Sequence, residues 1–179
     1  MSDTFLPGSG FDTYEHQDKV LVGLCGGTGC KAAVRILQQQ GFAVMGAVVR
    51  LCTDDPVVDA AKEAAKALGI ECITLNASEL ASQLAEETAA PADLRFPALL
   101  AAADRLGIQY IATGHHARVE LGSDGVHTVC PAVDTALDES AALAALPQDT
   151  LARLLLPLGE FTAADVQEMA QDFKVNGTV

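Results

Sequence analysis

Three segments that end in glycine, each followed at once by a short apolar run, limit the folds open to this chain. The apolar periodicity predicts helices over 31–40, 57–68 and 94–106, closed by the glycines at 41, 69 and 107. Apolar runs without polar alternation predict buried strands, at 20–24, 43–49, 70–75 and 110–113. Strands that alternate with helices of about 10–15 residues indicate βαβ units on a parallel sheet. The sequence therefore predicts an α/β fold, a three-layer α/β/α arrangement around an open parallel sheet.

The rest of the chain is expected to frame this sheet. A further helix is predicted over 78–87, and a hairpin over 119–130 around Ser123-Asp124-Gly125. Helices are predicted over 149–155 and 162–173, the second with Thr162 as N-cap and Asp165 as its capping-box partner. We expect residues 1–18 to form a flexible leader, 19–146 the α/β domain and 147–179 a short C-terminal helical extension.

The composition is that of a globular chain with one domain, because half of its 179 residues are hydrophobic and 20% are charged. Every apolar stretch is broken by Gly, Pro or a charge, so no membrane span is predicted. The first residues have no basic region of a secretory signal, so we expect a cytoplasmic protein. The five cysteines are then expected to be reduced thiols.

The charge balance bears on partners. Eleven Lys and Arg against 24 Asp and Glu give a formal net charge of −13. Phosphate neutralisation supplies much of the affinity of nucleic-acid-binding proteins, so the sequence argues against strong independent binding of RNA.

The most informative loop joins the first predicted strand to the first helix. It reads Gly23-Leu24-Cys25-Gly26-Gly27-Thr28-Gly29-Cys30-Lys31, and its glycines would let a ligand approach the backbone while the helix start offers N–H groups to an anion. A tight turn without a ligand is the plain alternative. A Walker A loop is excluded, because Lys31 does not directly follow the last glycine and is not followed by Ser or Thr.

Two phosphate motifs remain for this loop. Gly27-x-Gly29-x-x-Ala32 fits the dinucleotide fingerprint, but the second strand ends in Val48-Val49-Arg50 without the acidic residue that a ribose site needs. The other motif is the PP-loop, Ser-Gly-Gly-x-Asp-Ser, to which residues 25–30 align with only the two glycines kept.

The order of further motifs favours the PP-loop. These motifs are Leu37-Gln38-Gln39-Gln40-Gly41-Phe42, Asp59-Ala60, Ala67-Leu68-Gly69-Ile70, Leu94-Arg95-Phe96, Leu106 to Arg118 with Ala112-Thr113-Gly114-His115, Asp134, Asp138-Glu139-Ser140, and Leu151 to Glu160 with Pro157-Leu158-Gly159-Glu160. In this order they resemble the nucleotide-binding half of tRNA-specific 2-thiouridylases, which are PP-loop ATP pyrophosphatases with the adenine nucleotide alpha hydrolase-like fold. The resemblance covers about residues 19–175.

The resemblance implies an adenine-nucleotide site for ATP or AMP with Mg²⁺. Gly23, Gly26 and Gly27 would face phosphate, Val49 would flank the adenine, and Gly114 would lie by the ribose or adenine. For Gly114 a simple turn after the fourth strand is the alternative. The whole predicted nucleotide-binding set is Gly23, Leu24, Cys25, Gly26, Gly27, Thr28, Gly29, Cys30, Lys31, Val49 and Gly114.

The chain departs from the family where the chemistry takes place. Those enzymes adenylate a tRNA uridine and then displace AMP with sulfur carried on cysteines. Here Gly29 stands at the PP-loop Asp, and Ala90 stands where the first catalytic cysteine is expected. Thr88-Ala89-Ala90 replaces the family's Asn-Pro-Asp loop, and Leu137-Asp138-Glu139 replaces its Lys-Asp-Gln tRNA contact. The second cysteine would lie beyond Val179, which implies a divergent and truncated member.

These departures leave no catalytic residue to name. We expect a nucleotide-binding domain that is not a competent thiouridylase alone, whose missing parts a protein partner would supply. Any activity would be ATP-dependent, sulfur-transferase-like chemistry. A homodimer is left open.

A second hypothesis comes from thiols and imidazoles. Cys25, Cys30, Cys52, His115 and His116 follow predicted strands and would meet at the carboxyl edge of the sheet, where they could bind zinc or an iron–sulfur cluster or handle sulfur. The spacing matches no known metal motif. A non-catalytic interaction domain is the third hypothesis.

Overall fold

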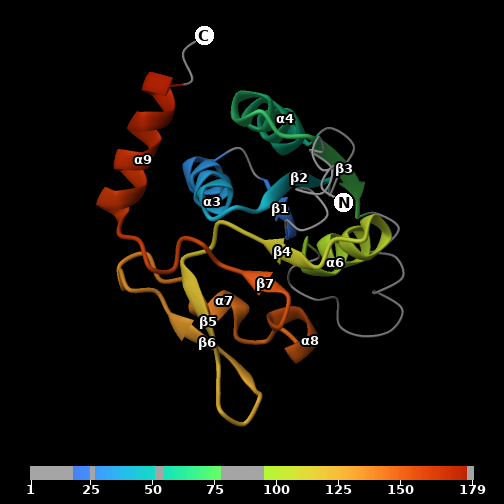
Figure 1. Cartoon of the computed structure of the whole chain (residues 1–179), viewed down its shortest axis with the longest axis vertical. Helices are drawn as coiled ribbons and strands as arrows, with labels where there is room; N and C mark the ends of the chain where they lie inside the picture. Colours follow the sequence, from blue (N-terminus) through green and yellow to red (C-terminus); the bar gives the residue numbers. More distant parts are fainter. Residues whose placement is uncertain (1–17, 25–26, 51–54, 78–94, 177–179) are drawn as a thin grey trace, which may run out of the picture.

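The centre of the protein is a five-stranded parallel sheet (Figure 1). The computed structural model describes residues 18–24, 27–50, 55–77 and 95–176. The strand order is β3-β2-β1-β4-β7, with every neighbouring pair parallel. The strands are β1 (Lys19–Gly23), β2 (Ala43–Arg50), β3 (Cys72–Asn76), β4 (Tyr110–Ala112) and β7 (Leu154–Leu155).

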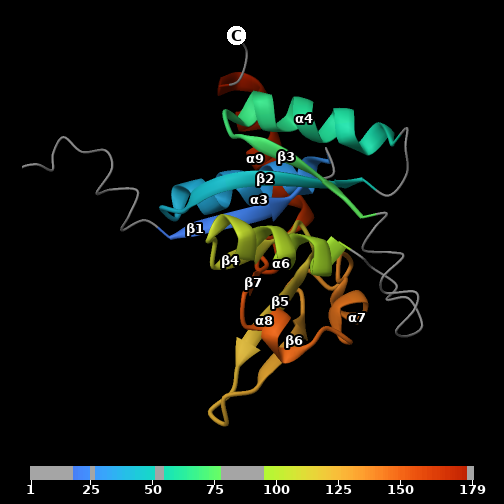
Figure 2. The ribbon, with the colours of Figure 1, turned by 90° about the vertical axis from the view of Figure 1, so that its right-hand side faces the viewer.

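Helices cover both faces of this sheet, as Figures 1 and 2 show. The helices α3 (Thr28–Gln39) and α4 (Pro56–Leu68) lie on one face, and α6 (Arg95–Leu106) lies on the other. The side chains of β1 alternate accordingly: Val20 and Val22 belong to the cluster under α3 and α4, whereas Leu21 packs under α6. The predicted α/β fold with an open parallel sheet is confirmed.

The predicted helix ends at glycine are confirmed too. Gly69 has φ +71° and its N–H donates to the carbonyl oxygen of Lys66, while the N–H of Ile70 donates to Ala65. This is a Schellman end, which turns an apolar residue inward to begin the next strand. Gly41 and Gly107 end α3 and α6 with the same pair of hydrogen bonds.

Helix α3 starts at Thr28, earlier than the apolar pattern predicted. Its N-cap is Gly27, so part of the glycine loop forms the first helical turn. The added residues are Thr28, Gly29 and Cys30, of which only Cys30 is buried in the core. One buried residue after Thr28 and Gly29, which carry no apolar side chain, is too little for periodicity to reveal the extra turn.

The predicted helix over 149–155 is wrong in its second half. Helix α8 comprises only Gln148–Leu151, and Leu154 and Leu155 form strand β7, paired with Ile111 and Ala112 of β4. An unpaired edge of the sheet lay beside this apolar run, and strand pairing with β4 outweighed local helix propensity.

A two-stranded antiparallel hairpin projects from the sheet (Figures 1 and 2). It consists of β5 (Ala117–Leu121) and β6 (His127–Pro131), as predicted, with Gly125 at φ +81° in its turn. The short helix α7 (Ser140–Leu143), which the sequence pattern missed, packs near β6.

The chain then reaches α9 (Ala163–Asn176), predicted over 162–173. The predicted capping box is present: the N–H of Thr162 donates to Asp165 Oδ2 at 3.0 Å, and the N–H of Asp165 donates to Thr162 Oγ1 at 3.2 Å. Val166 of this helix packs with Leu158 and Ile36 against α3.

Two expectations lie outside the described residues, the helix over 78–87 and the structure of the leader up to residue 17. Within the part of the chain that is described, no helix has the length and apolar character needed to cross a membrane.

Candidate functional site

The strand order reverses between β1 and β4, which makes this the switch point of the sheet. The chain winds from β1 outward to β2 and β3, then crosses to β4 on the other side of β1. Ligands of open parallel sheets lie outside the carboxyl ends of the strands at such a point. Here that edge is formed by the loop after β1, the first turn of α3 and the residues that follow β4.

Gly114 brings these two loops into direct contact. A Cβ atom added to Gly114 would lie 3.1 Å from the backbone nitrogen of Cys30 and 3.2 Å from the carbonyl carbon of Gly29. A Cβ atom on Gly29 would lie 3.6 Å from the Gly114 oxygen and 3.3 Å from Leu158 Cδ1. The structure therefore brings together Gly29, Cys30 and Gly114, which the sequence placed in one nucleotide site.

The first turn of α3 has the properties of an anion site. Its N-cap, Gly27, is extended (φ −77°, ψ 166°) and makes no side-chain capping hydrogen bond. The first turn contains no acidic residue. Thr28 is exposed, and Lys31, three residues further along the helix, is half-buried. Backbone N–H groups and the helix dipole at such an end favour a negative charge.

Three other predicted residues have packing roles. Leu24 is only 4% exposed, and its N–H donates to the Ala47 carbonyl at 2.7 Å. Gly23 gives room to α6, since a Cβ there would lie 3.1 Å from Leu99 Cδ1. Val49 packs with Ala98 on the α6 face. Their assignment to nucleotide stays a prediction, and Cys25 and Gly26 lie outside the described residues.

The proposed metal ligands point to different surroundings. Cys30 is buried in the core cluster with Val34. The ring of His115 stacks on Phe96 with centroids 5.9 Å apart, and its Nδ1 lies 2.8 Å from Thr113 Oγ1. The backbone of His116 is bound to Glu139: its N–H donates to Oε2 at 2.8 Å, and its carbonyl accepts from the Glu139 N–H at 2.8 Å.

Among the described residues, no group of three or more His, Cys, Asp or Glu could hold a metal ion. Cys25 and Cys52 are not among them, so the zinc or iron–sulfur hypothesis stays a prediction. The described thiols outside the edge are not activated: burial raises the pKa of Cys72, and burial, reinforced by Glu120, raises the pKa of Cys130.

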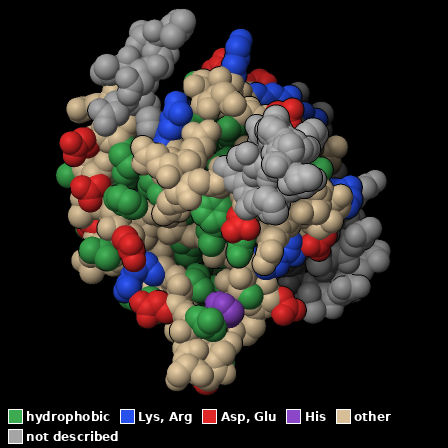
Figure 3. Space-filling view, viewed as in Figure 1, with side chains coloured by type: hydrophobic (Ala, Val, Ile, Leu, Met, Phe, Trp, Pro, Cys, Tyr) green, Lys and Arg blue, Asp and Glu red, His purple; other side chains and the backbone are tan. Residues whose placement is uncertain are grey.

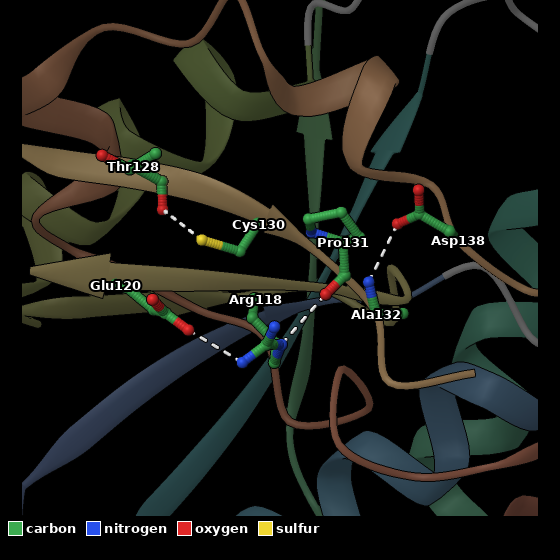
Figure 4. Close-up of polar contacts among 7 residues, drawn as sticks. All are labelled: Arg118, Glu120, Thr128, Cys130, Pro131, Ala132 and Asp138. Atoms are coloured by element: carbon green, nitrogen blue, oxygen red, sulfur yellow. Dashed lines mark hydrogen bonds and ion pairs between the residues drawn. The ribbon is translucent and has the colours of Figure 1, made fainter. Parts of the chain in front are cut away.

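The acidic motif after the hairpin builds structure. Asp138 accepts a hydrogen bond from the Ala132 N–H at 2.9 Å, which Figure 4 shows. It also accepts from the Ser140 N–H at 3.1 Å and the Ser140 hydroxyl at 2.8 Å, and thereby ties the end of β6 to the start of α7. Asp134 accepts from the Ala163 N–H at 3.1 Å, at the start of α9. The interpretation of Leu137-Asp138-Glu139 as the replacement of a tRNA contact missed this role. Its signal in the sequence is Asp138-x-Ser140, a pattern typical of a local turn.

These hydrogen bonds predict a pH dependence of stability. The hydrogen bond from the Ala132 N–H, and after it that from the Ser140 hydroxyl, lowers the pKa of Asp138 below its usual value of 3.8. The stabilisation by the carboxylate is thus complete above that value and lost as pH falls through the lower pKa of the folded state. We expect the melting temperature of wild type to exceed that of Asp138→Asn above about pH 5, and the gap to narrow below about pH 4. Asp149→Asn, at an exposed position outside this network, is the control for the loss of one carboxylate.

The sheet, the helices on both its faces and the switch point between β1 and β4 place the protein in the class of open, parallel α/β domains. The family model described as tRNA methyl transferase HUP domain matches residues 88–178, and the chain belongs to this family.

Curated relatives agree with the motif resemblance. The tRNA-specific 2-thiouridylase MnmA of Carboxydothermus hydrogenoformans is 33% identical over 187 aligned residues, covering 88% of this chain and 51% of the relative. MnmA of Moorella thermoacetica is 34% identical, covering 84% of this chain and 50% of the relative. The chain thus spans about half the length of the curated relatives it matches.

Solved structures show the same fold at low identity. A 4-thiouridine synthetase–RNA complex with bound ATP superposes with a TM-score of 0.54 at 13% identity, covering 87% of this chain and 40% of that one. The NH3-dependent NAD synthetase of Campylobacter jejuni gives 0.52 at 12% identity, covering 89% of this chain and 65% of that one.

Proposed function

We propose that this chain is an adenine-nucleotide-binding domain of a thiouridylase-like system for tRNA modification, and that it does not thiolate tRNA unaided. The observation that carries the proposal is the contact of Gly114 with the first turn of α3 at the switch point. That contact sets a helix start without a side-chain cap beside Gly114, which has no Cβ atom. The 2-thiouridylase relatives and the ATP-bound 4-thiouridine synthetase support the choice of ATP or AMP as the ligand.

The residues present fit a phosphate group. The N–H groups of the first turn of α3 would hold phosphate oxygens, with the Thr28 hydroxyl and the Lys31 ammonium within the same turn of helix. A carboxylate for Mg²⁺ is missing from this turn, because Gly29 stands where the PP-loop has Asp. Mg²⁺ would then be held mainly by the phosphates and water, as this ion tolerates.

The same departures limit the chemistry. With Ala90 at the position of the first catalytic cysteine, the chain cannot displace AMP with a thiolate there. We infer that a partner protein supplies the missing nucleophile and most of the RNA contacts. The net charge of −13 supports this division, and Figure 3 shows acidic side chains at separate places on one face. The proposed compartment is the cytoplasm, where tRNA is modified.

Thr28→Glu tests the proposed phosphate position. Thr28 is exposed and lies in the first turn of α3, so a carboxylate there interacts favourably with the helix dipole and leaves the fold intact. The same carboxylate would repel a phosphate. We expect the affinity for MgATP, measured by calorimetry on reduced protein, to fall about 10-fold or more without a loss of melting temperature.

Ala164→Glu is the matched control, because it adds the same charge to the exposed first turn of α9. Its MgATP affinity should equal that of wild type. Equal affinities for all three proteins would exclude the start of α3 as the phosphate site. Absence of heat from wild type with millimolar ATP and AMP would exclude the nucleotide function itself.

A further inference from the structure

Two buried side-chain atoms have no hydrogen-bond partner in the described part of the protein, Arg50 Nε and His116 Nδ1. Both lie at the carboxyl edge of the sheet: Arg50 is the last residue of β2, and His116 follows β4. β2 and β4 are the two strands that flank β1. Buried donors and acceptors in native proteins are nearly always paired, since leaving one unpaired costs its full desolvation energy. Two such atoms on either side of the glycine loop point to a polar ligand at this edge.

The position of Arg50 follows from the register of the sheet. β1 ends at Gly23, paired with Ala47, so β2 continues past it to Arg50, which pairs with Asn76 of β3. The backbone there is fixed, because the Arg50 carbonyl accepts from the Ala77 N–H at 3.0 Å. Val48 belongs to the cluster under α3 and α4. Side chains two apart on a strand share a face, so Arg50 also lies on the α3 and α4 face.

That position is unfavourable for an isolated cation. α3 and α4 both begin near this edge, and helix N-termini carry partial positive charge. A guanidinium stays charged at any physiological pH and has no acceptor atom of its own. Two other arginines have acceptors: Arg118 binds Glu120 and the Pro131 carbonyl, and Arg153 binds Asp104. An anionic ligand would resolve both the unpaired donor and the local excess of positive charge.

We propose that Arg50 is a phosphate-binding residue that holds the polyphosphate chain of ATP on the α3 and α4 face of the edge. The inference deepens the proposed function and rests on it for the identity of the nucleotide. Arg50 would supply the charge-assisted hydrogen bonds that the glycine loop, with Gly29 and thiols in place of its polar side chains, provides poorly. Its planar donors suit two phosphate oxygens at once.

The test compares wild type with Arg50→Met and with Arg105→Met, in buffer free of phosphate. Methionine keeps much of the apolar stem of Arg50 and removes its charge. Arg105 is exposed in the last turn of α6, at the opposite edge of the sheet, and is the control for loss of one positive charge. We expect Arg50→Met to bind MgATP about 10- to 100-fold more weakly, AMP less affected and adenosine unaffected. Its melting temperature without ligand should equal or exceed that of wild type.

The outcomes separate this inference from the proposed function. If wild type and Arg50→Met bind MgATP equally, the inference is wrong and nucleotide binding stands. If neither ATP nor AMP binds, but inorganic pyrophosphate raises the melting temperature of wild type and not of Arg50→Met, the adenine-nucleotide function fails and the phosphate site at Arg50 stands. An unliganded Arg50→Met that melts well below Arg105→Met would show a structural role and overturn the inference. The inference would also be overturned if Arg50→Met weakened the binding of a short RNA but not the binding of MgATP or pyrophosphate.

Discussion

The Gly159→Ala variant is expected to melt roughly 6–12 °C below wild type, a loss of about 3 kcal/mol in the free energy of unfolding. A Cβ atom on Gly159 would overlap the carbonyl oxygen and carbon of Ala117 at the start of β5. Neither backbone can move aside freely. The Gly159 carbonyl accepts from the Val133 N–H at 2.9 Å, and its own N–H donates to Leu156 at 3.3 Å. An alanine at position 159 therefore fits only if one of these hydrogen bonds breaks.

Gly125→Ala is the matched control for this prediction. Gly125 has φ +81°, but a Cβ atom there would meet nothing within 4 Å. Only backbone strain opposes alanine, at a cost of about 1–2 kcal/mol. Thermal melts followed by circular dichroism should rank Gly159→Ala clearly below Gly125→Ala. Equal losses of melting temperature, or a larger loss for Gly125→Ala, would mean that the backbones of Gly159 and Ala117 move apart to make room for a Cβ atom. Lack of space would then not be the reason for glycine at position 159.

The close contact between the backbones of Gly159 and Ala117 also affects the candidate site. The neighbouring Leu158 is fully buried and reaches the first turn of α3, where its Cδ1 would lie 3.3 Å from a Cβ on Gly29. Leu158 in turn packs with Val166 of α9. The segment after β7 thus supports the helix start that we propose to bind phosphate. Residues of the Pro-Leu-Gly-Glu block, far from the glycine loop in sequence, position that loop through packing.

The sequence predicted what local patterns encode. Helix ends at Gly41, Gly69 and Gly107, and the capping box of Thr162 with Asp165, depend on residues within a few positions of each other. The hairpin turn at Gly125 is of the same kind. These local devices alternate with apolar runs, and that alternation was enough to give the parallel sheet.

What the sequence could not predict depends on distant parts of the chain. β7 exists because β4 offers it an edge, and no pattern within residues 154–155 distinguishes that strand from the end of a helix. The role of Gly114 as a contact for α3, rather than a turn residue, needs the position of Cys30 in space. The unpaired Nε of Arg50 is a property of its surroundings, visible only once every described acceptor has been placed.

Arg153→Met is expected to lower the free energy of unfolding by about 2–3 kcal/mol, because the guanidinium of Arg153 joins the end of α6 to the start of β7. Arg153 Nε donates to the Gln109 carbonyl at 2.8 Å, Nη2 donates to the Ile108 carbonyl at 2.9 Å, and Nη1 binds Asp104 at 2.7 Å. The Arg153 carbonyl itself accepts from the Ile111 N–H at 2.9 Å, so this residue fixes β7 against β4 from both sides. Methionine preserves the stem and removes all the side-chain donors.

The controls separate the carbonyl bonds from the ion pair. Asp104→Asn removes only the salt bridge, in which the Asp104 side chain is 66% exposed, so its cost should stay below about 1 kcal/mol. Arg153→Lys keeps the charge but cannot bind both carbonyls in the plane of a guanidinium, and should fall between the other two. Urea denaturation of the three variants measures this order. A loss at Asp104→Asn as large as that at Arg153→Met would make the ion pair, and not the carbonyl bonds, the link that holds β7 to the sheet.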